Sequence, residues 1–152
     1  MCPLKNNNYK HMNIETIQAD LIDEFSMFDD WMDRYEHMID LGKSLPLINP
    51  KFKTEDNIIK GCQSKVWLHA DLENEKVVFS ADSDAIITKG IVAILIRVFS
   101  NQSPNTILNT NTDFIDEIGL KEHLSPTRAN GLVSMIKKIK MYALAYQTQI
   151  EL

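Results

Sequence analysis

The stretch VWLHADLENEKVVFSA, residues 66–81, decides the fold. On both sides of the polar triplet Glu73-Asn74-Glu75, apolar residues alternate with polar ones, which is the period of a strand with one buried face. A short polar segment between two such runs is typical of a tight turn. The apolar positions are Val66, Leu68, Ala70 and Leu72 before the turn, and Val77, Phe79 and Ala81 after it. The stretch therefore predicts two antiparallel strands joined as a hairpin.

Before the hairpin, the apolar residues between positions 14 and 41 recur at steps of three and four, the period of a helix with one buried face. This pattern predicts one bent helix or two consecutive helices. Gly42 stands where a left-handed residue would end the helical region, and Pro46 and Pro50 follow it. Residues 43–61 are therefore expected to form an extended loop that leads to the hairpin.

After the hairpin, an apolar run over residues 85–99 predicts a buried helix. The segment Asp82-Ser83-Asp84 precedes this run and supplies oxygen side chains of the kind that cap a helix N-terminus. Weaker patterns predict short helices after Pro104 and over residues 114–118.

The last part of the chain predicts a long final helix. Ser125-Pro126 provides a cap and a first-turn proline, and apolar residues follow at helical spacing from position 129 to 146. Helices before and after a central hairpin, without strand–helix–strand alternation, predict an α+β fold. We expect an antiparallel sheet of about three strands with helices packed mainly on one face.

Length and composition limit the function classes. The 152 residues suffice for one domain with its own core, expected over residues 13–150 after an Asn-rich tail at 1–12. A net charge of -5 argues against a surface built for nucleic acid or anionic lipid. The apolar run 85–99 is shorter than the ~20 residues of a membrane span. Two cysteines, Cys2 and Cys62, exclude a disulfide framework and favour a reducing, cytoplasmic location.

Cys62 lies in the segment Ile59-Lys60-Gly61-Cys62-Gln63-Ser64-Lys65, where the loop meets the first strand. The flanking lysines favour the thiolate, whereas an apolar pocket would oppose ionisation, and the sequence leaves this balance open. Cys62 can be a reactive thiol, a small packed core residue, or the nucleophile of a thiol hydrolase. A hydrolase needs a base, and the candidates His37, His69 and His123 show no recognisable pattern around the cysteine.

Other chemistry has weaker support. No paired cysteines or closely spaced histidines offer the ligands of zinc or an iron–sulfur cluster, and no glycine-rich phosphate loop is present, so no resident metal is expected. Asp82 and Asp84 could act as a carboxylate pair in acid–base catalysis. A simpler explanation is that one of them caps the following helix while the other is exposed to solvent. Arg128 opposes the dipole of the last helix, which favours acids in its first turn, so it is a candidate functional residue.

Four segments, taken in order, resemble the SufE family of sulfur-acceptor proteins. The resemblance extends from about Ile14 to Tyr146, and its specificity comes from four ordered segments around one cysteine. The segments are Trp31-x-x-Arg34-Tyr35 with Ile39-Asp-Leu-Gly42 and Leu45-Pro46, then Gly61-Cys62-Gln63-Ser64-x-Val66-Trp67, then Asp82-Ser83-Asp84-Ala85-x-x-x-Lys89-Gly90, and finally His123-Leu-Ser-Pro-x-Arg128-x-x-Gly131.

This resemblance implies the fold that SufE shares with the IscU-like iron–sulfur scaffold proteins, and it implies a role as sulfur carrier. Cys62 would accept sulfane sulfur, as a persulfide, from a PLP-dependent cysteine desulfurase of the SufS or CsdA type and would stimulate that enzyme. The sulfur would then pass to a cluster-assembly scaffold such as the SufBCD complex. PLP belongs to the partner, so no cofactor is implied for this chain, and a homodimer is left open. One thiol can shuttle sulfur but cannot hold a cluster alone.

The same segments imply roles around Cys62. Gly61 is expected to act as a hinge, Gln63 and Ser64 continue the loop, and Val66 and Trp67, together with Ile59, are expected to shelter a persulfide. The resemblance places Asp84 and Arg128 on a surface that holds the loop or docks the desulfurase. The alternative from another class is a regulatory binding module in which Cys62 merely packs.

Overall fold

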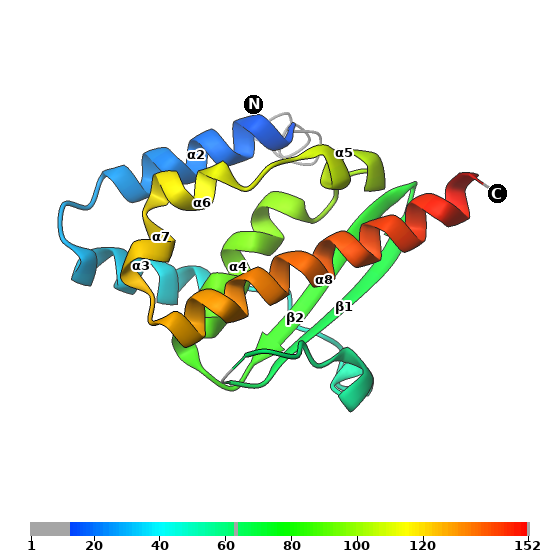
Figure 1. The fold of residues 1–152 in the computed structure, drawn as a ribbon, viewed down its shortest axis with the longest axis horizontal. Coiled ribbons are helices and arrows are strands. Elements are labelled where there is room, and N and C mark those ends of the chain that lie inside the picture. The colour runs from blue at the N-terminus through cyan, green and yellow to red at the C-terminus, as the bar shows by residue number, and fades with distance from the viewer. Residues whose placement is uncertain (1–12, 63, 152) are drawn as a thin grey trace, which may run out of the picture.

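The structure, a computed structural model, describes residues 13–62 and 64–151 (Figure 1). The tail predicted over residues 1–12 lies outside the described residues. The fold is α+β as predicted, with an antiparallel hairpin and helices packed mainly on one of its faces. The long helix α8, Pro126–Glu151, runs across the hairpin from one end of the molecule to the other.

The hairpin consists of β1, Val66–Glu73, and β2, Lys76–Ser83, paired in register from Val66↔Ser83 to Glu73↔Lys76. Asn74 and Glu75 join the strands with φ angles of 53° and 64°. Positive φ at both central residues is the geometry of a two-residue turn whose twist matches the twist of the strands. The structure thus confirms the hairpin and its turn.

The sheet has two strands in the described residues, and the prediction of about three is wrong in this detail. Outside the hairpin, only isolated bridges of one residue pair form with β1 and β2 in the described residues. They are Leu47↔Ala81, Ile58↔Trp67 and Val77↔Gln102. Pro46 directly precedes Leu47, and Pro104 follows two residues after Gln102. Proline lacks the N–H group that a longer ladder requires, so pairing at Leu47 and at Gln102 stops next to these prolines.

The helical pattern before the hairpin gives two helices, α2, Ile14–Ser26, and α3, Trp31–Lys43. The chain breaks between them because Asp30 begins α3 as its N-cap and accepts a hydrogen bond from the Met32 N–H at 3.0 Å. The remaining elements are the 3₁₀ turns η1, Pro50–Phe52, and η2, Glu55–Asn57, and the helices α4, Ile86–Phe99, α5, Pro104–Asn109, α6, Asp113–Ile118, and α7, Leu120–His123.

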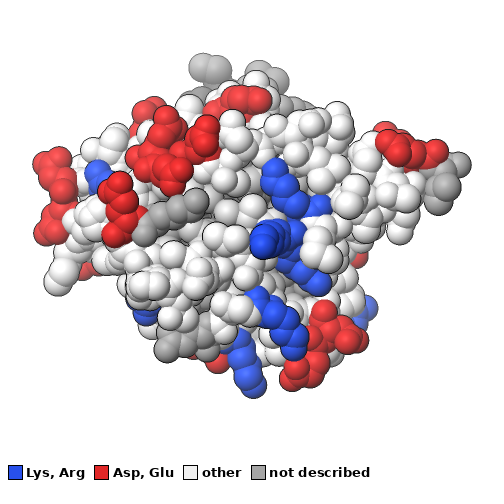
Figure 2. All heavy atoms as spheres, in the orientation of Figure 1, with Lys and Arg blue, Asp and Glu red and all other residues white. Residues whose placement is uncertain are grey.

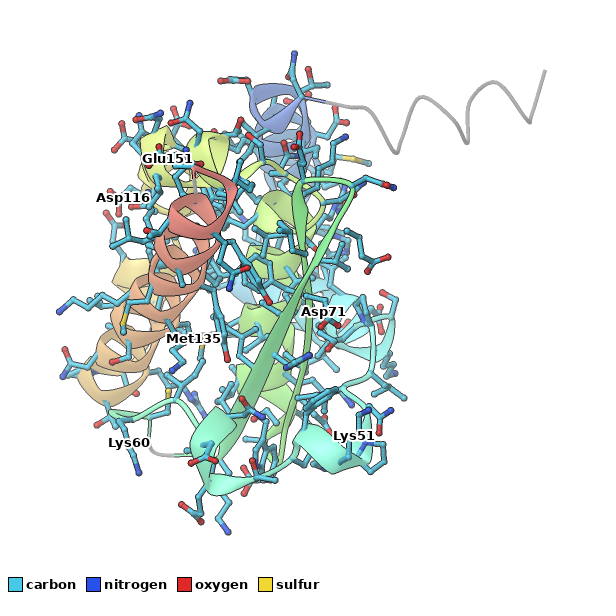
Figure 3. All side chains as sticks on the ribbon, turned by 90° about the vertical axis from the view of Figure 1, so that its right-hand side faces the viewer. Lys51, Lys60, Asp71, Asp116, Met135 and Glu151 are labelled. Carbon is cyan, nitrogen blue, oxygen red and sulfur yellow. The ribbon has the colours of Figure 1, made fainter. Side chains whose placement is uncertain are left out.

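The core lies between the helices and one face of the hairpin. The alternating apolar residues of β1 and β2 are buried, except for the partly buried Leu72, and belong to one cluster with apolar residues of α2, α3, α4, α6 and α8. Helix α8 is tied to β1 because Tyr146 Oη donates to the Ala70 carbonyl at 2.8 Å. Residues of η1 cover the opposite face, where the Phe52 ring stacks on His69 at 3.6 Å, and Lys51 of η1 lies across the hairpin from α8 (Figure 3).

Gly42 has a different role from the predicted one. It lies inside α3, which continues to Lys43, and its φ is not positive. A Cβ atom on Gly42 would lie 3.0 Å from the Gly90 nitrogen of α4. The residue is therefore required for the close crossing of α3 and α4, and Ser44 ends the helix.

The predicted cap of α4 is also wrong. Helix α4 begins after Ala85, and no side chain caps it. Asp82 instead pairs with Lys53 at 3.0 Å and Lys89 at 3.4 Å, and Asp84 binds the loop before β1. Long-range partners thus take the oxygen atoms that the local pattern assigns to the helix end. Within the described residues, no helix is long and apolar enough to cross a membrane.

Candidate functional site at Cys62

Cys62 lies just before β1, and the turn that contains it rests against the first half of α8. Gly61 precedes it with φ of 91°, a left-handed conformation that side chains disfavour. A Cβ atom on Gly61 would also lie 2.7 Å from Ser134 Oγ of α8. Glycine is therefore the residue that lets the chain turn into Cys62 while it stays against the helix.

The sulfur of Cys62 is half-buried and faces the backbone of α8. Its S–H donates weakly to the Gly131 carbonyl, with a sulfur–oxygen distance of 3.8 Å. A Cβ atom on Gly131 would lie 3.2 Å from Sγ. A glycine in the middle of this helical pattern thus makes the space that the thiol occupies.

A cavity of about 270 Å³ opens beside the thiol. Its walls come from three elements that are distant in sequence: the Cys62 loop, α4 and α8. Figure 3 shows Met135, one of the lining residues, on the side of α8 that faces the hairpin. The complete lining is Cys62, Ser64, Thr88, Ile91, Thr127, Arg128, Gly131 and Met135.

This lining differs from the shelter that the sequence predicts. Ser64 is part of it, but Val66 and Ile59 are buried in the core. Trp67 lies on the other face of the hairpin, where Lys53 Nζ sits 4.6 Å from its ring centroid. Gln63 lies outside the described residues. The cavity walls come instead from α4 and α8, because the loop is folded back onto these two helices.

The residues that sequence reasoning missed lie on those helices, and the sequence carries faint signals of them. Thr88 is a polar residue inside the apolar run 85–99, and Gly131 interrupts a strong helical pattern. Thr127, Ile91 and Met135 also line the cavity, but each is ordinary for its element and gives no signal.

Burial raises the pKa of the Cys62 thiol above its ordinary value. The sequence leaves open whether the flanking lysines or burial control ionisation of the thiol, and in the folded protein the effect of burial is the larger one. Lys60 and Lys65 are exposed, so water screens their charge from the sulfur. In the free protein at neutral pH, the thiol is mainly protonated and a weak nucleophile.

The loop after Cys62 is held at Lys65 by three hydrogen bonds. The Lys65 N–H donates to Asp84 Oδ1 at 3.0 Å, and the Lys65 carbonyl accepts from the Asp84 N–H at 3.2 Å and from Ser83 Oγ at 2.9 Å. These contacts fix the end of the loop to the segment that joins β2 to α4. Asp84 thus contacts the loop directly, whereas Asp82 lies with Lys53 and Lys89 away from it.

Arg128 lines the cavity from the first turn of α8 and is exposed. Its N–H donates to Ser125 Oγ at 3.3 Å, so Ser125 begins the helix as predicted. Its guanidinium forms no ion pair with any described residue. The residue therefore places an uncompensated positive charge at the mouth of the cavity.

A set of contacts from α3 fixes the chain just before α8. The Trp31 ring stacks on His123 at 3.7 Å, and Tyr35 Oη donates to the His123 carbonyl. Arg34 donates to the Phe28 carbonyl at 2.8 Å and to the Ile118 carbonyl at 3.2 Å. We call Trp31, Arg34, Tyr35 and His123 the α3–α7 clamp. It sets where α8 starts, and hence where Arg128 stands relative to Cys62.

Comparison with known proteins identifies the family. The family profile described as "SufE: Fe-S metabolism associated domain" matches residues 19–143. The chain belongs to the SufE family. That family is associated with iron–sulfur metabolism, and the matched range contains all four segments quoted above.

Relatives at the level of sequence and fold agree with this assignment. The SufE-family chain is 44% identical over 128 residues to an uncharacterized SufE-like protein of Rhizobium meliloti, and this alignment covers 81% of this chain and 91% of the relative. It is 39% identical over 119 residues to SufE-like protein 1, chloroplastic/mitochondrial, of Arabidopsis thaliana, covering 78% of this chain and 32% of the relative. The solution structure of a hypothetical protein from Thermus thermophilus matches the fold with a TM-score of 0.73 at 21% identity, covering 87% of this chain and 96% of the other.

The three histidines among the described residues of this SufE-family chain are engaged away from the cavity. His37 contacts Glu24 Oε1 and His69 contacts Asp71 Oδ1, each at 3.1 Å, while His123 belongs to the α3–α7 clamp. The cavity lining contains no histidine and no carboxylate. Among residues 13–62 and 64–151, no group of three or more His, Cys, Asp or Glu residues is arranged to hold a metal ion.

Proposed function

We propose that this SufE-family protein is a sulfur acceptor and carrier for iron–sulfur cluster assembly. In this proposal, Cys62 takes sulfane sulfur from the persulfide of a PLP-dependent cysteine desulfurase, stimulates that enzyme, and passes the sulfur to a cluster-assembly scaffold. The observation that carries the proposal is the half-buried thiol of Cys62, which faces a cavity whose described lining residues include no histidine and no carboxylate.

The chemistry is thiol–persulfide exchange. The Cys62 thiolate attacks the terminal sulfur of the donor persulfide, a new S–S bond forms on Cys62, and the donor's S–S bond breaks. The donor leaves as a thiolate, and any proton on the transferred sulfur moves with it, so charge and atoms balance. Delivery repeats the exchange, with Cys62 as the leaving thiolate.

Burial supports the carrier role between the two exchanges. An exposed persulfide reacts with oxidants and small thiols, whereas a half-buried one beside α8 is shielded. The same burial keeps the unloaded thiol protonated, so the thiol is activated only where a partner draws the loop outward. Gly61 is the residue at which the backbone can turn, because its left-handed φ leaves it without the restraint of a side chain.

The surface around the site also favours a protein partner of opposite charge. Although the chain carries a net charge of -5, α8 contains Arg128, Lys137, Lys138 and Lys140 and no acidic residue before Glu151. Figure 2 shows basic side chains gathered over the middle of the face that α8 crosses, with acidic side chains mainly toward its edges. Such segregation favours encounter with an acidic partner surface.

A mass measurement tests the proposal. The protein with Cys2→Ser is incubated with a cysteine desulfurase and cysteine, and its intact mass is measured without reductant. We expect a gain of ~32 Da, one sulfur atom, that maps to the peptide of Cys62. Incubation without cysteine is the control. The absence of this gain under conditions in which the desulfurase turns over would refute the carrier role.

The variant Cys62→Ser separates the carrier from a regulatory binding module. If Cys62 carries sulfur, the serine variant loses stimulation of the desulfurase while still binding it. If the serine variant stimulates as fully as the parent, the protein acts by binding alone. Serine is close in size to cysteine, so the loop retains its packing in this comparison.

A further inference from the structure

The cavity beside Cys62 has a polar wall, which we define as Ser64, Thr88, Thr127 and Arg128. Three of these residues carry hydroxyl groups and the fourth carries a guanidinium. They come from the loop, from α4 and from the first turn of α8, so only the tertiary structure assembles them. The proposed sulfur exchange by itself uses none of these side chains.

Thr88 is the residue of the polar wall that requires an explanation. The residue is only 6% exposed and lines the cavity, and its hydroxyl makes no hydrogen bond with any described residue. Its oxygen is not among the fully enclosed, unpaired side-chain atoms of the described residues, so the hydroxyl keeps access to the cavity, where it can donate a hydrogen bond. Valine has nearly the same shape and would serve an apolar wall equally well, so a threonine whose hydroxyl meets the cavity without a protein partner points to a ligand that accepts its hydrogen bond.

A persulfide on Cys62 has one direction in which to extend. On the side of α8, Sγ is closed in by the Gly131 backbone, since even a Cβ atom there would lie 3.2 Å away. The second sulfur, ~2.05 Å from Sγ, must therefore enter the cavity. The cavity of about 270 Å³ is ample for a sulfur atom.

We propose that the polar wall is a subsite for the terminal sulfur of a Cys62 persulfide in its anionic form. The hydroxyls of Ser64, Thr88 and Thr127 donate hydrogen bonds to this sulfur, and Arg128 supplies the counter-charge. This inference rests on the proposed function, because it assigns a place to the sulfur that the carrier holds.

The two sulfur atoms then have opposite surroundings. Sγ of the unloaded thiol faces a carbonyl oxygen, which accepts from S–H and disfavours a thiolate. The terminal sulfur faces donors and a positive charge, which stabilise an anion. The loop therefore holds a protonated thiol when empty and an ionised persulfide when loaded.

The charged groups around the subsite support this difference. Arg128 is the one charged residue of the lining. Lys60 and Lys65 flank the loop and are exposed, and Asp84, near the start of α4, directs Oδ1 to the Lys65 N–H. No carboxylate of the described residues lines the cavity to offset the charge of Arg128.

The test loads the persulfide chemically, without a desulfurase. The Cys2→Ser protein is converted at Cys62 to a mixed disulfide with thionitrobenzoate and then treated with sulfide, which displaces the aryl thiolate and leaves a persulfide. The mass confirms loading. Alkylation rates of the loaded and unloaded forms are then measured from pH 5 to 10 for the parent and for Thr88→Val, Thr88→Ser and Arg128→Gln.

We expect the loaded Thr88→Val and Arg128→Gln proteins to require a higher pH for alkylation, with rates about two- to tenfold below the parent at the parent's midpoint. Thr88→Ser keeps the hydroxyl and should match the parent. The unloaded thiol of Thr88→Val should be alkylated as in the parent. Thr148→Val, an exposed threonine on α8, is the control for the substitution itself.

Equal profiles for the loaded parent, Thr88→Val and Arg128→Gln would overturn the subsite. An equal shift of the loaded and unloaded forms would also overturn it, because it would show a general change in the loop. Arg128 is exposed, so its variant remains informative even if Thr88→Val fails to fold. Because loading is chemical, this result is independent of whether a desulfurase delivers sulfur to Cys62, which the mass measurement above decides.

Discussion

At the scale of single residues, the reactivity of Cys62 is set by burial. The thiol lies between two lysines whose charges face water, while its sulfur faces a helix carbonyl and a cavity. Desolvation penalises the thiolate, and exposed charges are screened within a short distance. A cysteine that resembles an activated nucleophile in the sequence is therefore a restrained one in the folded protein.

The pH dependence of alkylation tests this restraint. In the folded Cys2→Ser protein, the raised pKa of Cys62 predicts an alkylation midpoint at higher pH than in the same protein unfolded in urea. At neutral pH, the folded protein should react more slowly. The raised pKa also affects stability. The protonated Cys62 thiol contributes its full stabilisation below the pKa that the thiol has in the unfolded chain, and this stabilisation is lost as the pH rises through the pKa of the folded protein. In Cys62→Ser, the free energy of unfolding should not show this decrease at high pH. A folded midpoint at or below the unfolded one contradicts the prediction.

Asp84 restrains the same loop through its side chain. Asp84→Ala removes one of the three hydrogen bonds at Lys65, and because the carboxylate is exposed we expect a loss of about 1 kcal/mol in the free energy of unfolding. A looser loop should also expose the thiol, so alkylation of Cys62 should become faster. Asp84→Asn keeps the accepting oxygen and serves as the matched control. Equal alkylation rates in the alanine and asparagine variants would show that the bond does not restrain Cys62.

At the scale of elements, the site depends on how closely helices approach. Helices α3 and α4 cross at Gly42 and Gly90, and α8 meets the Cys62 loop at Gly131. The α3–α7 clamp then fixes the start of α8. Since α4 and α8 both form cavity walls, the two helix contacts and the clamp together decide the shape of the cavity.

Gly90→Ala tests the helix crossing. A Cβ atom there would overlap the Met38 carbonyl oxygen and lie 2.8 Å from Met38 Cγ. Alanine improves helix propensity by ~1 kcal/mol, but overpacking against a backbone atom costs ~1–3 kcal/mol, near the upper end here because a carbonyl cannot move aside. We expect a net loss of about 2 kcal/mol in urea unfolding. Ala145→Gly, exposed on α8, measures the propensity effect alone. A more stable Gly90→Ala protein would show that the helices separate without cost.

At the scale of the whole molecule, one core connects the hairpin with α2, α3, α4, α6 and α8. Elements far apart in the sequence are joined, since Tyr146 of α8 binds β1 and α2 packs near α6. Such a molecule is expected to lose its core in one cooperative step.

The two tryptophans test this cooperativity, because Trp31 reports on the α3–α7 clamp and Trp67 on the outer face of the hairpin. In Trp67→Phe and in Trp31→Phe, the fluorescence of the remaining tryptophan and the far-UV circular dichroism should give the same urea midpoint. The comparison is made within each variant, so a change in stability does not affect it. Two separate midpoints in one variant would divide the predicted domain of residues 13–150 into two units.

The sequence alone determined the elements whose signals are local. Periodicity and the residues of turns and first helical turns act over a few positions, so they predict elements locally. They predicted the hairpin and its turn, the apolar helix that ends at Phe99 and the final helix that begins at Pro126. The α+β class followed from their order. The four ordered segments around Cys62 also sufficed to indicate the SufE family, which the profile match over residues 19–143 confirms.

Only the tertiary structure decided what the local pattern left open or misassigned. Gly42 serves a helix crossing, Asp84 holds the Cys62 loop and Asp82 pairs with Lys53, because these contacts between distant parts of the chain replace the local cap and turn. Whether Cys62 favours its thiol or thiolate form depended on burial, which no sequence pattern measures. The cavity joins Ser64, Thr88 and Thr127 from three elements, and only packing brings side chains so distant in sequence around one sulfur atom.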